Sequence, residues 1–188
     1  MHLTKTLIST TCALLLGAPA LLAACDSGGD GATSDTLGGD TAATPMVDAT
    51  AVATTAMAYK AGGFTRITEV PAMSQHQGSD VVVWAQNDVA AIYRAADPAN
   101  TSASVAFPEG ATIVKEQLDD QGEMYAITVM HKGPAGYAPD SDDWFFERVE
   151  KDGTISQQGQ VGFCITCHSP RKPVDWVFGI TAANQTAQ

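Results

Sequence analysis

Five consecutive residues near the C-terminus, Cys164-Ile165-Thr166-Cys167-His168, constrain this chain more than any other segment. Two cysteines separated by two residues and followed directly by histidine form the attachment signature of a c-type haem. The two thiols can add across the two vinyl groups of one haem, and the imidazole can then bind the iron as an axial ligand. We therefore predict one covalently bound haem c, attached to Cys164 and Cys167 and ligated by His168.

Other sites share part of this pattern. A structural zinc site usually needs four nitrogen or sulfur ligands, so His76, His131 or another ligand pair would have to converge on the motif, because the chain offers no second cysteine pair of this kind. A thioredoxin-like redox pair or a plain disulfide would use Cys164 and Cys167 but would leave His168 without a role. Haem attachment uses all three residues and is the preferred hypothesis, while the zinc and disulfide alternatives stay open.

The N-terminus has the composition of an export signal. Residues 1–24 contain Lys5, then an apolar stretch too short to span a bilayer, and no acidic residue. The segment ends in Leu-Ala-Ala before Cys25, which resembles the box of bacterial lipoproteins, where the cysteine becomes the lipidated N-terminus. We expect Cys25 to anchor the protein to a bacterial membrane on the extracytoplasmic, periplasmic side. An ordinary signal peptide or a retained anchor is the alternative.

Composition divides the remainder into two parts. Residues 25–55 are rich in Gly, Ser, Thr, Ala and Asp and are predicted to be a flexible tether. Residues 56–188 have the length of one domain. The formal net charge is −11, which disfavours binding to nucleic acid and could instead favour a basic redox partner protein.

Apolar runs and turn residues predict the elements of the domain. The expected elements are strands over 81–84, 111–118, 124–132 and 144–150, a helix over 89–96 and a short helix over 161–169. This order predicts an α+β fold: an antiparallel β-sheet domain with short helices that carries one covalent c-type haem. An all-helical bundle fits the pattern poorly.

Several short segments of the domain resemble the cytochrome P-460 family, including the c′-beta cytochromes. In chain order they are FPEGATIVKE at 107–116, VMHK at 129–132, DWFF at 143–146, CITCH at 164–168 and DWVFG at 175–179. The resemblance implies a mainly β domain with one c-type haem, usually in a homodimer. It also implies an iron with histidine on one side and an open face on the other, and known activities of hydroxylamine oxidation and nitric oxide binding.

The resemblance assigns roles to a few residues. Cys164 and Cys167 match the thioether cysteines, and His168 matches the proximal ligand. Lys115 matches the lysine that is cross-linked to the haem in the hydroxylamine-oxidising members. Without the resemblance, Lys115 would be interpreted as an ordinary exposed lysine in a strand.

The chain departs from the family at the open face of the haem. The hydroxylamine oxidisers place a carboxylate there, but the corresponding stretch, 128–131, contains no Asp or Glu. His131 could replace it as a proton acceptor, since imidazole titrates near neutrality. Strand alternation, however, sends Met130 and His131 to opposite faces. A Met130 that faces the haem would make the pocket apolar or supply a sixth ligand.

Three functions remain open from the sequence. The first is an oxidoreductase that acts on hydroxylamine or nitric oxide, with Lys115, Met130 and His131 as candidate catalytic residues. The second is an electron-transfer cytochrome with a six-coordinate haem. The third is a non-catalytic nitric oxide binder, which would need an apolar pocket and no base.

Overall fold

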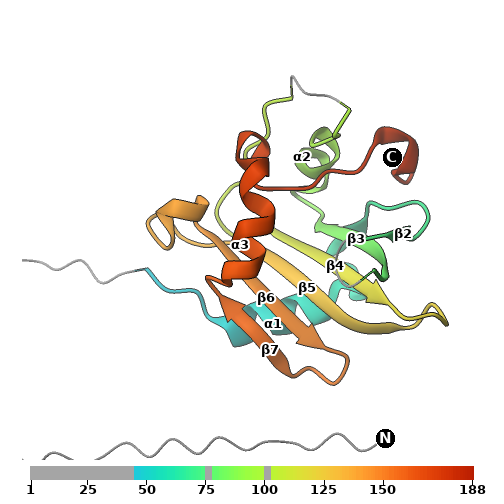
Figure 1. Cartoon of the computed structure of the whole chain (residues 1–188), viewed down its shortest axis with the longest axis horizontal. Coiled ribbons are helices and arrows are strands. Elements are labelled where there is room, and N and C mark those ends of the chain that lie inside the picture. Colours follow the sequence, from blue (N-terminus) through green and yellow to red (C-terminus); the bar gives the residue numbers. More distant parts are fainter. Residues whose placement is uncertain (1–44, 75–77, 100–102) are drawn as a thin grey trace, which may run out of the picture. The chain divides into compact units, whose positions relative to one another are not determined.

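A seven-stranded antiparallel sheet is the centre of this protein (Figure 1). The structure is a computed structural model that describes residues 45–74, 78–99 and 103–188. The order across the sheet is β1-β3-β4-β5-β6-β7, and β2 also pairs with β3. The strands are β1 (Phe64–Arg66), β2 (Ala72–Met73), β3 (Asp80–Gln86), β4 (Thr112–Leu118), β5 (Met124–Lys132), β6 (Trp144–Glu150) and β7 (Ile155–Gly159).

Short helices connect and cover these strands. Within the described ranges, three are α-helical: α1 (Ala49–Met57), α2 (Ala90–Ala95) and α3 (Gly162–His168). Four are single turns or short runs of 3₁₀-helix: η1 (Tyr59–Ala61), η2 (Pro139–Ser141), η3 (Ser169–Val174) and η4 (Ala182–Asn184). The predicted strands and both predicted helices are therefore present, and the antiparallel sheet with short helices is confirmed.

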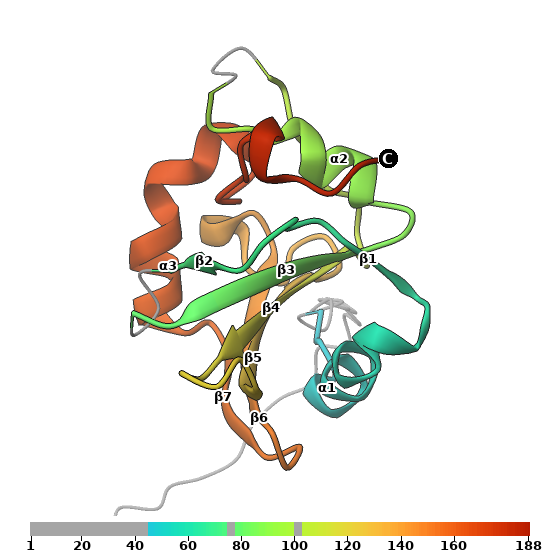
Figure 2. The ribbon, with the colours of Figure 1, turned by 90° about the vertical axis from the view of Figure 1, so that its right-hand side faces the viewer.

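The sheet separates two apolar cores (Figure 2). The α1 helix packs on one face, where it buries Val52 and Ala56 against Val114, Ile127 and Val149. The second core lies on the other face, beneath α2, α3 and the C-terminal segment, and includes Trp144, Phe146 and Trp176. Because side chains alternate along a strand, each central strand contributes to both cores.

The folded region begins earlier than the composition predicted. Residues 49–55, which the composition predicts to be part of the tether, form most of α1. The Asp48 carboxylate accepts a hydrogen bond from the Ala51 backbone N–H at 3.1 Å and so caps the helix. The segment contains neither Gly nor Pro, and its apolar side chains fall on one helical face that the sheet buries.

The strand register decides which side chains share a face. Lys115 of β4 lies opposite Val83 of β3 and Thr128 of β5, and Thr128 lies opposite Arg148 of β6. These four residues therefore form one row across the sheet, on the face that carries α3. Ile113, Met130 and Phe146 form the neighbouring row on the same face.

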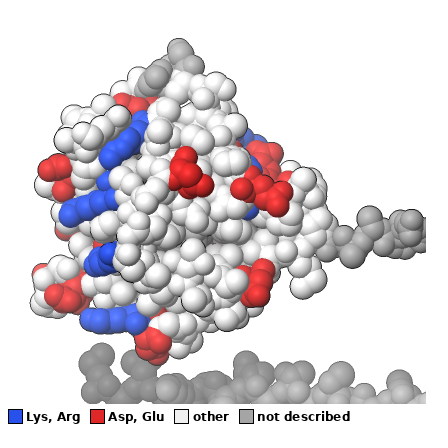
Figure 3. Space-filling model, turned by 180° about the vertical axis from the view of Figure 1, so that it is seen from behind, with Lys and Arg blue, Asp and Glu red and all other residues white. Residues whose placement is uncertain are grey.

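Basic and acidic side chains are interspersed on the face of the described residues seen in Figure 3. None of the helices in the described ranges has the length and apolar character to cross a bilayer. The predicted signal segment, Cys25 and the N-terminal part of the predicted tether lie outside the described residues.

Candidate functional site

The Cys-x-x-Cys-His motif forms α3, which lies against the sheet face that carries Lys115 (Figure 1). Cys164 and His168 line a small cavity of about 40 Å³ between α3 and the sheet. Cys167 lines a second cavity of about 370 Å³. The two cavities share four lining residues, Val83, Tyr93, Lys115 and Phe178. The motif and Lys115 therefore border one continuous region of the fold.

The imidazole of His168 is held in the neutral form, with one nitrogen free, that a metal ligand requires. Its Nδ1 lies 2.7 Å from the backbone carbonyl oxygen of Trp176. A carbonyl can only accept, so Nδ1 carries the proton and Nε2 keeps a free lone pair. Burial lowers the pKa of His168 to about 4, against the opposing effect of the Trp176 hydrogen bond, so the ring is neutral at physiological pH. The rings of Phe146 and Phe178 pack edge-on against the imidazole.

Cys164 and Cys167 are both free thiols, one helical turn apart on α3. Burial raises the pKa of Cys164, which keeps that thiol protonated at neutral pH. The two thiols are not joined by a disulfide in this structure. Among the described residues, no cluster of three or more His, Cys, Asp or Glu side chains is placed to hold a metal ion, and His76, a possible ligand of the zinc alternative, lies outside them.

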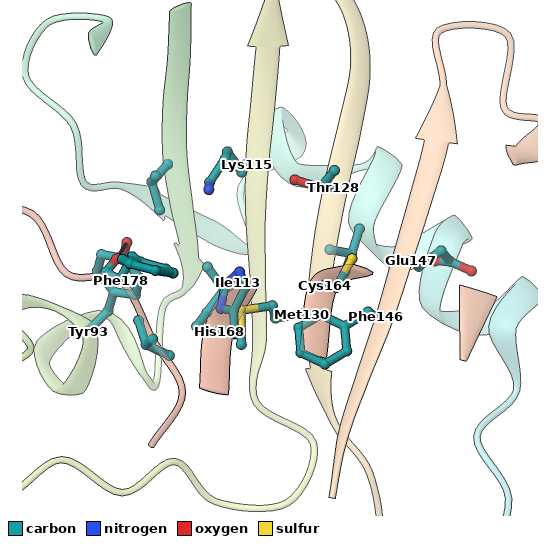
Figure 4. Close-up of a pocket in the computed structure, with 13 residues that line it drawn as sticks. Tyr93, Ile113, Lys115, Thr128, Met130, Phe146, Glu147, Cys164, His168 and Phe178 are labelled. Atoms are coloured by element: carbon teal, nitrogen blue, oxygen red, sulfur yellow. Dashed lines mark hydrogen bonds between the residues drawn. The ribbon is translucent and has the colours of Figure 1, made fainter. Parts of the chain in front are cut away.

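Lys115 has its side chain in this region (Figure 4). Burial lowers the pKa of its amine to about 8, although the nearby Cys167 and Cys164 act in the opposite direction. A fraction of the amine is therefore neutral and nucleophilic near neutral pH. Lys115 is therefore not the ordinary exposed strand lysine that the residues alone predicted.

The structure separates Met130 from His131. Met130 lines the small cavity and its side chain points toward His168 (Figure 4). His131 lies on the opposite, α1 face of the sheet, where its Nδ1 is 2.9 Å from the Thr112 hydroxyl. Burial lowers the pKa of His131. The sheet therefore stands between His131 and the cavity, which removes this residue as a candidate base for chemistry there.

Glu147 is a buried acid that the sequence analysis did not select. Glu147 borders the small cavity, but its carboxylate points away from His168 and Met130 (Figure 4). Both carboxylate oxygens are buried without a hydrogen-bond partner, and burial raises the pKa of the group to about 7. Strand alternation puts Glu147 on the same face as the aromatic Phe145, which is the one sequence signal that could have indicated its burial.

The side chains present fit a haem. A neutral imidazole with one nitrogen fixed and the other free, two free thiols on the same helix and an apolar aromatic wall are the donor set and surroundings that such a group needs. Tyr93, Phe146 and Phe178 supply the aromatic part of that wall. The second cavity extends the space on the Cys167 side.

Comparison with known families agrees with this geometry. The model of a family described as cytochrome P460 matches residues 62–179, which span β1 to the segment after η3 and include Lys115 and the whole motif. A search of curated proteins finds no match.

Proposed function

This chain belongs to the cytochrome P460 family, which makes it a haem protein, and from this premise we propose that it is a mono-haem c-type cytochrome that binds a small nitrogen species such as nitric oxide. Cys164 and Cys167 would form the two thioether bonds, and His168 would be the axial ligand through Nε2. The haem supplies an iron with a coordination position for the small molecule. The hydrogen bond from His168 to Trp176 supports this assignment, since it leaves the correct nitrogen free.

The nature of the cavity wall favours binding over hydroxylamine oxidation. Oxidation would need a proton acceptor within hydrogen-bond reach of the substrate. Among the described residues that line the small cavity, the one carboxylate, Glu147, points away, and His131 lies behind the sheet. The remaining wall is mainly aliphatic and aromatic, and its one amine, that of Lys115, is the group that we assign to the haem edge rather than to proton transfer. This arrangement is the observation that carries the proposal, and it suits an uncharged diatomic ligand.

Electron transfer is the second candidate function, and Met130 is the observation that favours it. Its thioether points toward His168, and methionine opposite histidine is a usual ligand pair of six-coordinate c-type haem. In that case the iron would have no free position.

One experiment tests the proposal and separates the candidates. The full chain, matured with a cytochrome assembly system, would be tested for haem that stays attached after denaturation. Its ferrous absorption spectrum would then be recorded with and without carbon monoxide and nitric oxide. We expect covalent haem and a high-spin spectrum that changes with both gases. A sharp low-spin spectrum that neither gas changes would contradict gas binding, and its loss in Met130→Ala would establish the second candidate.

Lys115 provides a further test of the family chemistry. We propose that its amine contacts the haem edge and can form the cross-link of the hydroxylamine-oxidising members, in which one N–C bond replaces an amine N–H and a haem C–H and a two-electron oxidant such as a peroxide takes up the electrons. A cross-linked haem should show a strongly red-shifted Soret band, which Lys115→Ala should abolish while the haem stays attached. Lys172→Ala, close to the motif but outside the cavity lining, is the matched control. A red shift that persists in Lys115→Ala would contradict the assignment.

We also propose a cellular location and partners for this protein. An export signal over 1–24 and lipid on Cys25 would anchor the haem domain to the periplasmic side of a bacterial membrane, where c-type haem is attached. The acidic chain could exchange electrons with a basic redox partner protein. The domain could also pair as a homodimer, as the family does.

A further inference from the structure

The carbonyl that accepts the His168 N–H belongs to an unusual stretch of backbone. Asp175 and Trp176 both adopt left-handed conformations, with φ of 50° and 65°. Such conformations are strained for residues other than glycine, so the surrounding contacts must hold them in place. The orientation of the Trp176 carbonyl toward His168 depends on this pair.

The Asp175 side chain supplies three of those contacts. Its Oδ1 accepts hydrogen bonds from Lys132 Nζ at 2.6 Å and from Trp144 Nε1 at 3.0 Å. Its Oδ2 accepts one from the Phe107 backbone N–H at 2.6 Å. Asp175 is 9% exposed, and the side chain of Lys132 is 14% exposed. Three donors from three separate segments of the chain therefore fix one carboxylate directly beside Trp176.

The indole of Trp176 is fixed separately. Its Nε1 donates to Asp142 Oδ2 at 2.6 Å, and Trp176 is 1% exposed. The peptide between Asp175 and Trp176 is thus held at both ends, so the carbonyl that follows has little freedom to rotate. The His168 N–H then meets an acceptor whose position is set by the core of the protein.

We propose that Asp175 is a positioning residue for the haem iron. Anchored by Lys132, Trp144 and Phe107, it keeps the Trp176 carbonyl within hydrogen-bond reach of His168 Nδ1 and thereby strengthens His168 as an electron donor to the metal. The hydrogen-bond partner of a ligating histidine controls both ring orientation and ligand basicity, and ligand basicity sets the properties of the iron. This inference depends on the proposed haem ligation by His168.

The test compares Asp175→Asn with wild type in the haem-loaded full chain. Asparagine keeps the shape but removes the charge that holds Lys132, so the Trp176 carbonyl should move and the histidine hydrogen bond should weaken. We expect the iron–histidine stretching frequency of the ferrous protein, measured by resonance Raman spectroscopy, to fall. The reduction potential should rise, because a weaker donor stabilises the ferric state less. The potential can be measured for either coordination state.

The chain offers a matched control on the other face of the sheet. Glu116 is also a buried carboxylate that accepts from a lysine, Lys60, and from an indole, that of Trp84. Glu116→Gln should lower stability in a similar way but leave the stretching frequency and the potential unchanged. A shift of equal size in Glu116→Gln, or unchanged values in Asp175→Asn, would overturn the proposal.

If Asp175→Asn does not fold, a milder variant can be tested in its place. Lys132→Met removes the ion-pair partner but leaves the carboxylate, and it should shift both readouts in the same direction. Unchanged values for folded, haem-loaded Lys132→Met would then overturn the proposal. Wild type without covalent haem would refute the proposed function itself. Wild type with haem but variants without shifts would refute only the role of Asp175.

Discussion

Glu147 and Glu116 are both buried acids on the α1 face of the sheet, but only Glu116 has partners. Glu116 accepts from Lys60 and Trp84, whereas neither carboxylate oxygen of Glu147 has a hydrogen-bond partner. An unpartnered buried carboxylate favours its neutral form, which explains why burial raises the pKa of Glu147 to about 7. The ionisation of Glu147 therefore makes the free energy of unfolding depend on pH.

The direction of the pKa shift of Glu147 determines whether stability rises or falls with pH. Between the ordinary glutamate pKa and about 7, the folded protein keeps the Glu147 proton while the unfolded chain releases it. The contribution to stability is thus complete at low pH and decreases until the pH passes about 7. We expect Glu147→Gln to raise the free energy of unfolding at pH 8 by roughly 1–3 kcal/mol and to change it little at pH 4.5. Urea unfolding at both pH values measures this.

Glu150, on the same strand, is the control with opposite sign. Hydrogen bonds from Ser156 and Arg148 lower the pKa of Glu150, so its contribution is present at neutral pH and is lost as the pH falls. Glu150→Gln should therefore destabilise slightly at pH 8. The assignment for Glu147 would be wrong if wild type and Glu147→Gln lost the same stability between pH 4.5 and 8.

Some roles of single residues could be predicted from the sequence, and others could not. The haem-attachment motif of Cys164, Cys167 and His168 could be identified from the sequence because the spacing of these residues along the chain defines it. Strand alternation placed Met130 and His131 on opposite faces. The roles of Glu147 and Asp175 could not be predicted, because the burial of Glu147 and the three donors to Asp175 come from segments distant in sequence.

At the scale of elements, the C-terminal segment packs on α2 through a backbone contact. A Cβ added to Gly179 would lie 1.3 Å from the carbonyl oxygen of Ala96, just after α2. The neighbouring Phe178 lines the cavities, and its carbonyl accepts from the Tyr93 hydroxyl at 2.7 Å. Gly179 is therefore the point where this wall of the cavity is attached to the fold.

Gly179→Ala should separate these two elements. Backbone atoms cannot move aside as a flexible side chain can, so we expect a loss of at least roughly 2 kcal/mol in the free energy of unfolding. Thermal unfolding of the haem-loaded protein measures it. Gly162→Ala at the start of α3 is the control, since a Cβ there meets nothing within 4 Å. Equal stability of the two variants would contradict the close packing of Gly179.

The elements that the sequence predicted are those with strong apolar patterns. β3 to β6 and the two helices α2 and α3 follow from apolar runs and turn residues. The edge strand β7 was missed because most of its side chains are polar and exposed, and its pairing with β6 defines it. α1 was missed because Ala and Thr also dominate the tether, and only contact with the sheet distinguishes the helix.

At the scale of the whole molecule, membrane attachment would depend on residues outside the described ranges. The described residues provide no membrane-spanning helix, and a net charge of −11 opposes attraction to anionic lipid. If the protein is held at a membrane, the sequence offers two physical means, a retained apolar segment within residues 1–24 or a covalent lipid on Cys25, and the lipid is the one that we propose. The site at which the chain meets the membrane and the site at which it binds haem should then be independent of each other.

Cys25→Ser tests that independence in the full chain expressed in a bacterium. Without the thiol no lipid can be attached, so the protein should move from the membrane fraction to the soluble extracytoplasmic fraction, with its haem content unchanged. Cys12→Ser alters a cysteine in the predicted signal, which cleavage would discard, and should leave the protein in the membrane fraction. Fractionation with haem staining of each fraction measures both outcomes. Retention of Cys25→Ser in the membrane, or release of Cys12→Ser, would show that something other than lipid on Cys25 determines location.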